Sequence, residues 1–302
     1  MRCLVTGGAG FIGSNLDDAL IARGDEVCVL DDLSTGRRDN VNAKADLIEA
    51  EVSDPAAVRS AIAGCEVVFH QAAHRAVLRS VEDPLATDTA NVHGTLTLLD
   101  AAQAAGVRRL VYASSSSVYG GADLRPTPET APLLPRSPYA VTKLAGEHYC
   151  RVFTELHGLE TVALRYFNVF GPRQGPDSMY AAVIPLFIDA LRNGRRPVVH
   201  GDGQQSRDFT YIEDVVAANL AAAAAPAALA SGHAYNIACG GEYSLLELLD
   251  HLSEIIGVKV EPEHTDPRAG DVRHSCADVS AAARDLSWKA NVTFRDGLAR
   301  TV

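Results

Sequence analysis

The chain has 302 residues, of which 47% are apolar and 22% are charged, a composition typical of a globular protein and not of a disordered or fibrous one. Its 27 Lys and Arg residues against 38 Asp and Glu residues give a net charge of −11, which argues against nucleic acid or anionic lipid as the main partner. No apolar run approaches the ~18 residues that a membrane span needs, so we expect no membrane partner either. At about 150 residues per domain, the length predicts one large domain or two closely packed ones.

The chain begins with an apolar, strand-like run and shows no charged leader or cleavage site, so a reducing cytoplasm is the expected location. Its six cysteines are scattered without a Cys-x-x-Cys pair, which favours buried free thiols over disulfides or zinc. His70 and His74 have a spacing that binds metal on a helix, but His70 ends an apolar strand-like run. We therefore expect no metal site.

Short apolar runs alternate with helical patterns through the first half of the chain. They predict strands at 2–6, 26–30, 46–50, 66–70, 109–114 and 161–167, and helices at 13–23, 55–63, 91–105 and 139–157. This alternation predicts an α/β fold, a Rossmann-type doubly wound parallel sheet with helices on both faces.

The pattern loosens after residue 167. A loop over 171–180 precedes a helix at 180–193, a strand at 197–200, a helix at 212–225 and a strand at 234–238. We expect a nucleotide-binding domain over 1–167 that also takes in about 210–238. Residues 168–302 should mostly form a smaller C-terminal α/β lobe packed directly on it.

A glycine-rich turn follows the first predicted strand. Gly7, Gly10 and Gly13 lie between that strand and the first helix, where backbone N–H groups can approach a pyrophosphate at the positive end of the helix. The second strand ends in Asp31 and Asp32, and Asp31 has the position of a carboxylate that accepts hydrogen bonds from a ribose diol. The combination predicts a dinucleotide cofactor.

The same carboxylate selects between cofactors. A 2′-phosphate beside Asp31 would be repelled, so we expect NAD and not NADP. Arg37 and Arg38 follow closely and could hold a 2′-phosphate, but we interpret them as a solvated loop.

The fifth predicted strand ends in four serines, Ser114 to Ser117, at the sheet edge where ligands bind. Tyr139 and Lys143 follow at i and i+4 on one helix face. A cation one turn away favours the phenolate and lowers the pKa of a tyrosine. Tyr139 could then exchange a proton with a substrate hydroxyl while a hydride moves to or from the nicotinamide.

With these residues in view, the chain resembles the extended short-chain dehydrogenase/reductase superfamily and, within it, the UDP-hexose 4-epimerases. The resemblance spans essentially the whole chain. It rests on GGAGFIG at 7–13, DDLSTG at 31–36, SSSSVYG at 114–120, YAVTK at 139–143, RYFNVFGPR at 165–173, GDG at 201–203, RDF at 207–209 and RAGD at 268–271.

The resemblance implies roles for individual residues. The catalytic set would be Ser115, Tyr139 and Lys143. The NAD-binding set would be Gly7, Gly10, Phe11, Ile12, Gly13, Asp31, Asp32, Ser34, Thr35, Gly36, Asp54 at the adenine, Ala72, Ala73, Asn91, Tyr139 and Lys143. The UDP-sugar set would be Ser115, Tyr139, Asn168, Val199, Arg207, Arg268, Asp271 at the ribose and Ser275. Forked cationic donors such as Arg207 and Arg268 also make independent sense, because an acidic protein needs them to hold a diphosphate.

Individual residues also favour some reactions of the resembled family over others. Dehydratases of the family carry an Asp-Glu pair where this chain has Ser116 and Ser117, so loss of water is disfavoured. An isomerase that inverts a UDP-sugar at C4, by transient oxidation and re-reduction, is the favoured function. A UDP-uronate 4-epimerase stays open, with Arg75 and Arg79 as candidate cations for the carboxylate, as does another enzyme of the family that modifies a nucleotide sugar. A catalytically silent NAD sensor is the alternative of a different class.

Two expectations concern selectivity and assembly. Ser275 lies four residues after Asp271, where the family borders the 2-position of the sugar, and its small size favours acceptance of both plain hexoses and their 2-acetamido forms. The apolar helices at 91–105 and 139–157 could pair across a two-fold axis, so we expect a homodimer.

Overall fold

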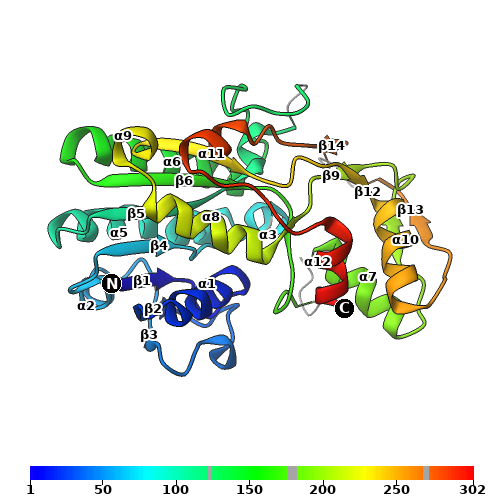
Figure 1. The fold of residues 1–302 in the computed structure, drawn as a ribbon, viewed down its shortest axis with the longest axis horizontal. Helices are drawn as coiled ribbons and strands as arrows, with labels where there is room; N and C mark the ends of the chain where they lie inside the picture. Colours follow the sequence, from blue (N-terminus) through cyan, green and yellow to red (C-terminus); the bar gives the residue numbers. More distant parts are fainter. Residues whose placement is uncertain (76, 122–123, 176–181, 268–271) are drawn as a thin grey trace.

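The computed structural model describes residues 1–75, 77–121, 124–175, 182–267 and 272–302. Its centre is a seven-stranded sheet in the order β11-β6-β5-β4-β1-β2-β3, in which every neighbouring pair is parallel (Figure 1). The strands are β1 (Arg2–Thr6), β2 (Glu26–Asp31), β3 (Asp46–Glu49), β4 (Val67–His70), β5 (Arg109–Ser115), β6 (Glu160–Tyr166) and β11 (His233–Ile237). The predicted fold class is confirmed.

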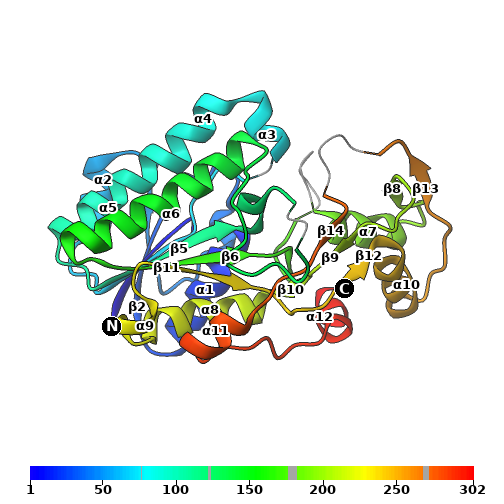
Figure 2. The same cartoon turned by 90° about the horizontal axis from the view of Figure 1, so that it is seen from above.

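Helices cover both faces of this sheet (Figure 2). One face carries α1 (Phe11–Ala22) and α8 (Ile212–Ala224), and the other carries α2 (Pro55–Ile62), α5 (Gly94–Ala104) and α6 (Pro138–His157). The bounds of α6 follow from its sequence, because Ser137 caps its first turn, Pro138 begins it and Gly158 ends it in the left-handed conformation. This capping fixes the start of the helix that carries Tyr139 and Lys143.

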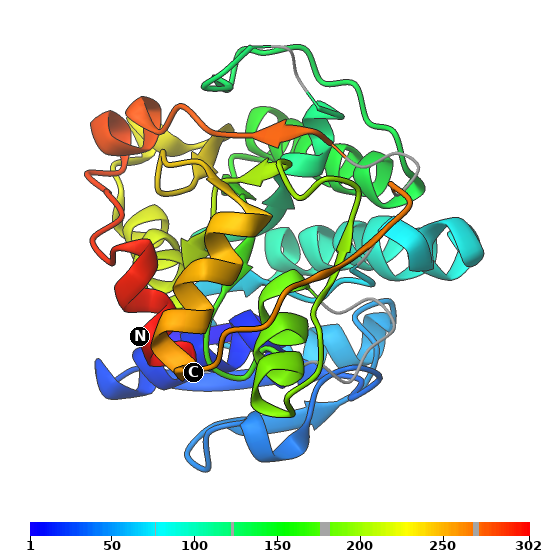
Figure 3. The same ribbon diagram turned by 90° about the vertical axis from the view of Figure 1, so that its right-hand side faces the viewer.

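The remaining elements form what we call the C-terminal lobe, beside the carboxyl ends of the strands (Figures 1 and 3). Its helices are α7 (Val183–Arg192), α10 (Leu245–Ile256) and α12 (Phe294–Thr301). Its strands are only two or three residues long: β7 (Val169–Phe170) with β10 (Thr210–Tyr211), β8 (Val198–His200) with β13 (Glu263–Thr265), and β12 (Tyr243–Ser244), β9 (Ser206–Arg207) and β14 (His274–Ser275) as a three-stranded sheet.

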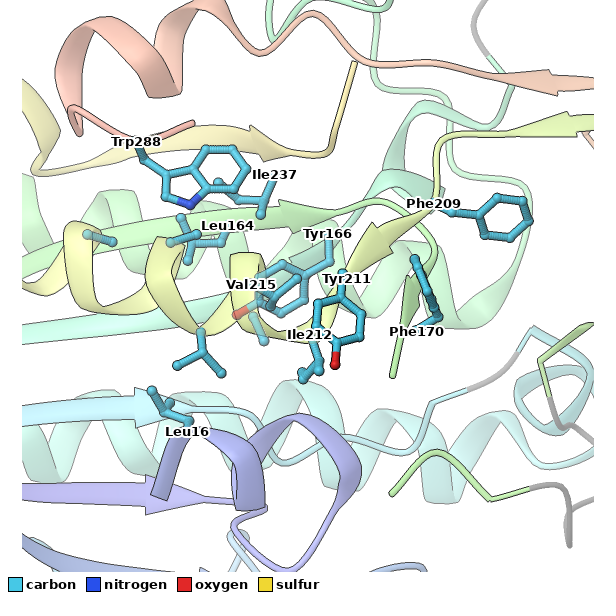
Figure 4. Close-up of a cluster of buried hydrophobic side chains, with 14 of the residues drawn as sticks. Leu16, Leu164, Tyr166, Phe170, Phe209, Tyr211, Ile212, Val215, Ile237 and Trp288 are labelled. Atoms are coloured by element: carbon cyan, nitrogen blue, oxygen red, sulfur yellow. The ribbon is translucent and has the colours of Figure 1, made fainter. Parts of the chain in front are cut away.

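One hydrophobic core runs from the sheet into the C-terminal lobe (Figure 4). Leu16 and Val215 meet between α1, α8 and the sheet, and the Trp288 ring packs beside Ile237 while its Nε1 donates to the Asp214 carbonyl at 3.0 Å. The aromatic rings Phe170, Phe209, Tyr211 and Phe294 continue the core into the lobe. Because the two parts share packed side chains, the crevice between them has defined walls.

The structure departs from the sequence expectations in several places. Residues 77–88, with no predicted element, form α3 (Val77–Glu82) and α4 (Pro84–Asp88), and the expected helix at 91–105 is a π-helical turn at Thr89–His93 followed by α5. Besides α8, α9 (Ala227–Ala230) and β11, which lie in the segment that the sequence assigned to the first domain, α11 (Ser280–Asp285) also returns to the main sheet and packs on β11. Within the described ranges, no helix is long and apolar enough to cross a membrane.

Candidate functional site

The glycine-rich turn lies at the switch point of the sheet, where the chain order reverses between β1 and β4. Gly7 has a φ of +72°, and a Cβ atom there would lie 2.7 Å from the backbone nitrogen of Ala72. A Cβ atom at Gly13 would overlap the carbonyl of Gly7. Only glycine fits both positions, and the resulting cradle of bare backbone at the start of α1 suits a pyrophosphate.

This cradle is the floor of a cavity of about 140 Å³, which we call the cofactor groove. Most of the predicted cofactor residues line it: Gly7, Gly10, Phe11, Ile12, Gly13, Asp31, Asp32, Ser34, Thr35, Ala72 and Ala73. The donor set therefore fits a dinucleotide such as NAD.

Asp31 is nearly buried at the end of β2 and is already hydrogen bonded. Its Oδ2 accepts from the Ala9 backbone N–H at 2.9 Å and its Oδ1 from that of Leu33 at 2.8 Å, which leaves about two of the four acceptor sites of a carboxylate for a ribose diol. Burial raises the pKa of Asp31, and these two hydrogen bonds oppose the rise. Arg38 pairs with Glu49, so this cation is occupied, as expected for an NAD-selective loop.

Five predicted cofactor residues do not line the groove: Tyr139 and Lys143, which are described below, and Gly36, Asp54 and Asn91. Gly36 packs against Ala9 and the Asp31 carboxylate, and Asp54 caps α2 by accepting from two backbone N–H groups. Asn91 is buried in the π-helical turn, where its side chain bonds both the N–H and the carbonyl of His74 and the hydroxyl of Thr142. Asn91 therefore ties the groove wall to α6.

The predicted catalytic residues lie together at the carboxyl edge of β5. A hydrogen-bonding interaction with the Ser115 hydroxyl, and the charge of Arg75, lower the pKa of the Tyr139 phenol, but burial outweighs both, so the pKa is raised above its ordinary value. The Lys143 ammonium lies 5.9 Å from the centre of the Tyr139 ring and donates to the Ala113 carbonyl at 2.8 Å.

Lys143 is not among the groups that lower the Tyr139 pKa in this geometry. Burial disfavours both charged forms: it raises the pKa of the phenol and lowers that of the Lys143 ammonium to about 8. The expectation that Lys143 tunes Tyr139 therefore stays a prediction for the working complex.

A buried ion pair stands behind these residues. Arg165 on β6 makes a forked contact with Glu147 on α6 at 2.9 and 2.8 Å, and Ser114 also donates to Glu147. Arg165 further donates to the Tyr119 hydroxyl at 2.8 Å. The pair fastens the catalytic helix to β5 and β6, and nothing in the sequence spacing predicts it.

A cavity of about 360 Å³ opens over Ser115 and Tyr139, and we call it the catalytic cavity. Three predicted substrate residues from the other side of the crevice also line it, namely Asn168, Arg207 and Ser275. Sequence reasoning missed the walls that Tyr119, Arg136, Tyr166, Phe167 and His274 contribute. The only sequence signal for Arg136 is its position directly before the Ser-Pro pair at which α6 starts.

Asn168 and Arg207 also line a larger cavity of about 720 Å³ against α7, which we call the α7 cavity, so the two cavities form one crevice. Val199 lines neither cavity and its side chain is fully buried in the core, so its predicted place in the substrate set stays a prediction. The predicted Arg268 and Asp271 lie outside the described residues.

The structure also places the arginines, the histidine and the cysteines that the sequence analysis considered. Arg75 lines the cofactor groove and not the catalytic cavity, and Arg79 lies on α3, so neither is on the cavity wall where a substrate carboxylate was expected to need a cation. Both ring nitrogens of His70 are engaged, with Thr6 at 2.7 Å and Thr95 at 2.9 Å, so His70 is not available as a metal ligand. The six cysteines are free thiols, four of them buried.

Comparison with known proteins adds to this geometry. Residues 3–238 match the sequence model of the NAD dependent epimerase/dehydratase family. The chain is 42% identical to a UDP-glucose 4-epimerase of Mycolicibacterium smegmatis, over 100% of this chain and 97% of that protein.

Solved structures give the same picture. The UDP-glucose 4-epimerase of Thermotoga maritima, solved with UDP-glucose, superposes with a TM-score of 0.96 at 37% identity and covers 100% of this chain and 97% of its own. The UDP-N-acetylglucosamine 4-epimerase of Methanobrevibacter ruminantium, solved in complex with UDP-N-acetylmuramic acid, gives a TM-score of 0.93 at 38% identity, with 99% and 96% covered.

Proposed function

The chain belongs to the NAD-dependent epimerase/dehydratase family of extended short-chain dehydrogenases, and from this premise we propose that it is an isomerase that inverts UDP-sugars at C4. The observation that carries the proposal is one crevice in which Tyr139 and Ser115 face Asn168, Arg207 and Ser275, next to a groove that fits NAD. UDP-glucose and UDP-galactose are the proposed substrate pair.

Different parts of the crevice are proposed to bind different parts of the UDP-sugar. Asn168 and Arg207 lie where the catalytic cavity meets the α7 cavity, so a diphosphate held there would direct the sugar toward Tyr139 and the uridine toward α7. Arg207 supplies a forked donor, and Asn168 is fixed by its side-chain bond to the Asp208 carbonyl at 3.2 Å. Arg268 and Asp271 remain proposed partners of the diphosphate and the ribose.

The protein residues move the proton. Tyr139, with Ser115 beside it, takes the proton of the C4 hydroxyl and returns it, which calls for a phenol whose pKa falls toward neutral in the working complex. NAD held in the cofactor groove would supply a reversible hydride acceptor and, in its oxidised form, a positive charge to the site. Lys143 holds its place through the Ala113 carbonyl and Asn91 holds the His74 segment of the groove wall.

Epimerisation is favoured over loss of water because no Asp or Glu is found among the described residues that line the catalytic cavity. Ser116 and Ser117 occupy the turn after β5, and neither is an acid that could expel water from a 4-keto sugar. The cavity of about 360 Å³ leaves a sugar room to present its other face before it is reduced. A catalytically silent NAD sensor would need none of this arrangement.

Ser275 supports a broader substrate range. It lies on β14, beside Arg207 on β9, and lines the catalytic cavity with a small side chain. We propose that UDP-N-acetylglucosamine and UDP-N-acetylgalactosamine are also interconverted. Ser275→Tyr should suppress turnover of the acetamido sugars while UDP-glucose serves as the internal reference, and unchanged turnover of the acetamido sugars would remove Ser275 as the gate.

We also propose a homodimer that uses α6, as the sequence indicated, but with α3 and α4 beside it in place of α5. Leu98 and Leu99 of α5 are buried and Leu96 is half-buried. By contrast, α3, α4 and α6 pack together and expose Leu78, Val81, Leu85, Val152 and Leu156. Sedimentation of the wild type and of Leu156→Glu tests this surface, since a dimer should dissociate in the variant.

The direct test of the proposed function is a panel of UDP-sugars incubated with the purified protein. We expect UDP-glucose and UDP-galactose to interconvert without added oxidant and without net NADH. Binding of NAD with no turnover of any UDP-sugar would instead support the sensor.

A further inference from the structure

The catalytic cavity has an unusual charge for so acidic a protein. Its described wall carries three cationic or protonatable side chains, Arg136, Arg207 and His274, and no Asp or Glu. Glu242, the nearest acid in contact with His274, pairs with it at 3.2 Å and also with Arg125, but does not line the cavity. The part of the cavity wall that the structure describes therefore favours an anionic group on the ligand.

Arg136 is the wall cation that the chain itself leaves unengaged. It is exposed and, toward the described residues, makes no hydrogen bond or ion pair. By contrast, Arg125 and Arg165 pair with Glu242 and Glu147. An arginine that lines a cavity without an internal partner keeps its forked donors for a ligand.

The position of Arg136 indicates which part of a sugar it would meet. It precedes Ser137, the cap of α6, and lies three residues before Tyr139, while its Cγ would be 3.2 Å from a Cβ atom on Gly120. Because the sugar C4 must lie at the Tyr139 hydroxyl, Arg136 is suited to a substituent on a carbon that flanks C4. The Ser116 hydroxyl, which also lines the cavity, has no hydrogen-bond partner in the described part of the chain and could donate to the same group.

We infer that the catalytic cavity accepts UDP-sugars that carry a carboxylate next to C4, and that Arg136 is the residue that binds this carboxylate. The inference rests on the proposed function and specifies a substrate class for it. Two substrates share this chemistry: a uronate, whose carboxylate is at C6, and a muramate, whose lactyl carboxylate is attached at C3. The serines at 116 and 117 fit the inference, since an acid at either position would repel such a ligand.

The experiment measures kcat/KM of the NAD-loaded enzyme for UDP-glucuronate, UDP-N-acetylmuramate and UDP-glucose. We expect wild type to epimerise at least one carboxylate sugar. In Arg136→Gln, kcat/KM for the carboxylate sugar divided by kcat/KM for UDP-glucose should fall about tenfold or more. The fall should come mainly from a higher KM for the carboxylate sugar, because a charge-assisted hydrogen bond is lost. Arg136→Lys should restore part of the ratio.

Arg151→Gln is the matched control, because Arg151 is an exposed arginine of α6 that pairs with Glu155 away from the cavity. It should leave the ratio unchanged. If the ratio falls for only one of the two carboxylate sugars, that sugar shows whether Arg136 binds a carboxylate at C6 or one attached at C3. If wild type turns over UDP-glucose but neither carboxylate sugar, or if Arg136→Gln leaves the ratio as it was, the inference fails while the proposed function stands. If no UDP-sugar is turned over, the proposed function itself fails.

Discussion

The main sheet and the C-terminal lobe contribute to the site in opposite ways. The sheet presents its groups at the ends of β1, β2, β4, β5 and β6, which are four to seven residues long, largely buried and paired with a neighbour on each side. The lobe presents Arg207 and Ser275 on paired strands of only two residues. The chemistry thus lies on a rigid frame, and substrate recognition lies on a surface assembled from short segments far apart in the chain.

The first way to sharpen this comparison is to break one ion pair in each region. Arg165→Met leaves the buried Glu147 without its cation and should lower the free energy of unfolding by about 3–5 kcal/mol. The Arg273–Asp202 pair of the lobe is equally well aligned, at 2.7 and 2.8 Å, but is solvent-exposed, so Arg273→Met should change stability little. Urea unfolding of both variants measures the contrast.

A double variant, Glu147→Leu with Arg165→Met, is the control for the buried pair. It should recover part of the lost stability, because no unpaired charge stays buried. Equal effects of the two single variants would contradict the view that the sheet is the rigid part.

The second prediction separates chemistry from recognition. Tyr139→Phe should lower kcat for every accepted UDP-sugar by about 10²-fold or more, since a positioned acid/base is lost, while NAD stays bound. Tyr149→Phe, on the same helix, is the control. Near-normal turnover in Tyr139→Phe would exclude Tyr139 from proton transfer.

The third prediction concerns acid sensitivity of the sheet. Burial lowers the pKa of His70 from 6.5 to about 3, with a smaller contribution from Lys143. Between pH 6.5 and pH 3 the His70 imidazole is protonated in the unfolded chain but neutral in the folded chain. The free energy of unfolding should therefore fall as the pH falls, by about 2 kcal/mol between pH 7 and pH 5. His70→Gln should flatten this part of the profile, whereas His264→Gln in the lobe should not. A wild-type profile that rises toward pH 5 would contradict the assignment.

The fourth and smallest effect tests cofactor selection by the sheet. Asp31→Asn removes the charge that repels a 2′-phosphate and should shift the NAD to NADP affinity ratio about tenfold toward NADP. Asp46→Asn, on the neighbouring β3, should leave the ratio unchanged. If wild type copurifies with NADP, Arg37 and not Asp31 decides the selectivity.

The same division explains how far the sequence could predict the structure. The strands through Tyr166 and the helices α1, α2 and α6 were predicted to within about two residues, because each has a continuous apolar pattern and α6 also has clear caps. The short helices α3 and α4 were missed, and part of the helix expected at 91–105 is a π-helical turn. The cofactor cradle was equally predictable, because Gly7 to Gly13 form one contiguous turn.

The substrate wall was less predictable for a physical reason. Strands of two residues have no periodicity, and the pairing of Ser275 with Arg207 is set by the fold and not by local preference. Local sequence likewise gives no signal for the Glu147–Arg165 pair, and for Arg136 it gives only the position directly before the Ser-Pro start of α6. The resemblance located Ser275 and Arg207, but it also suggested Val199, whose side chain is in the core.

The most direct test of the central claim, that C4 is transiently oxidised and re-reduced within this crevice, uses UDP-glucose that carries deuterium at C4. The purified protein should convert it to UDP-galactose with the deuterium still at C4, because the hydride is returned to the same carbon without exchange with water. Loss of the deuterium to solvent, or the absence of UDP-galactose from a reaction with NAD-loaded protein, would contradict the account.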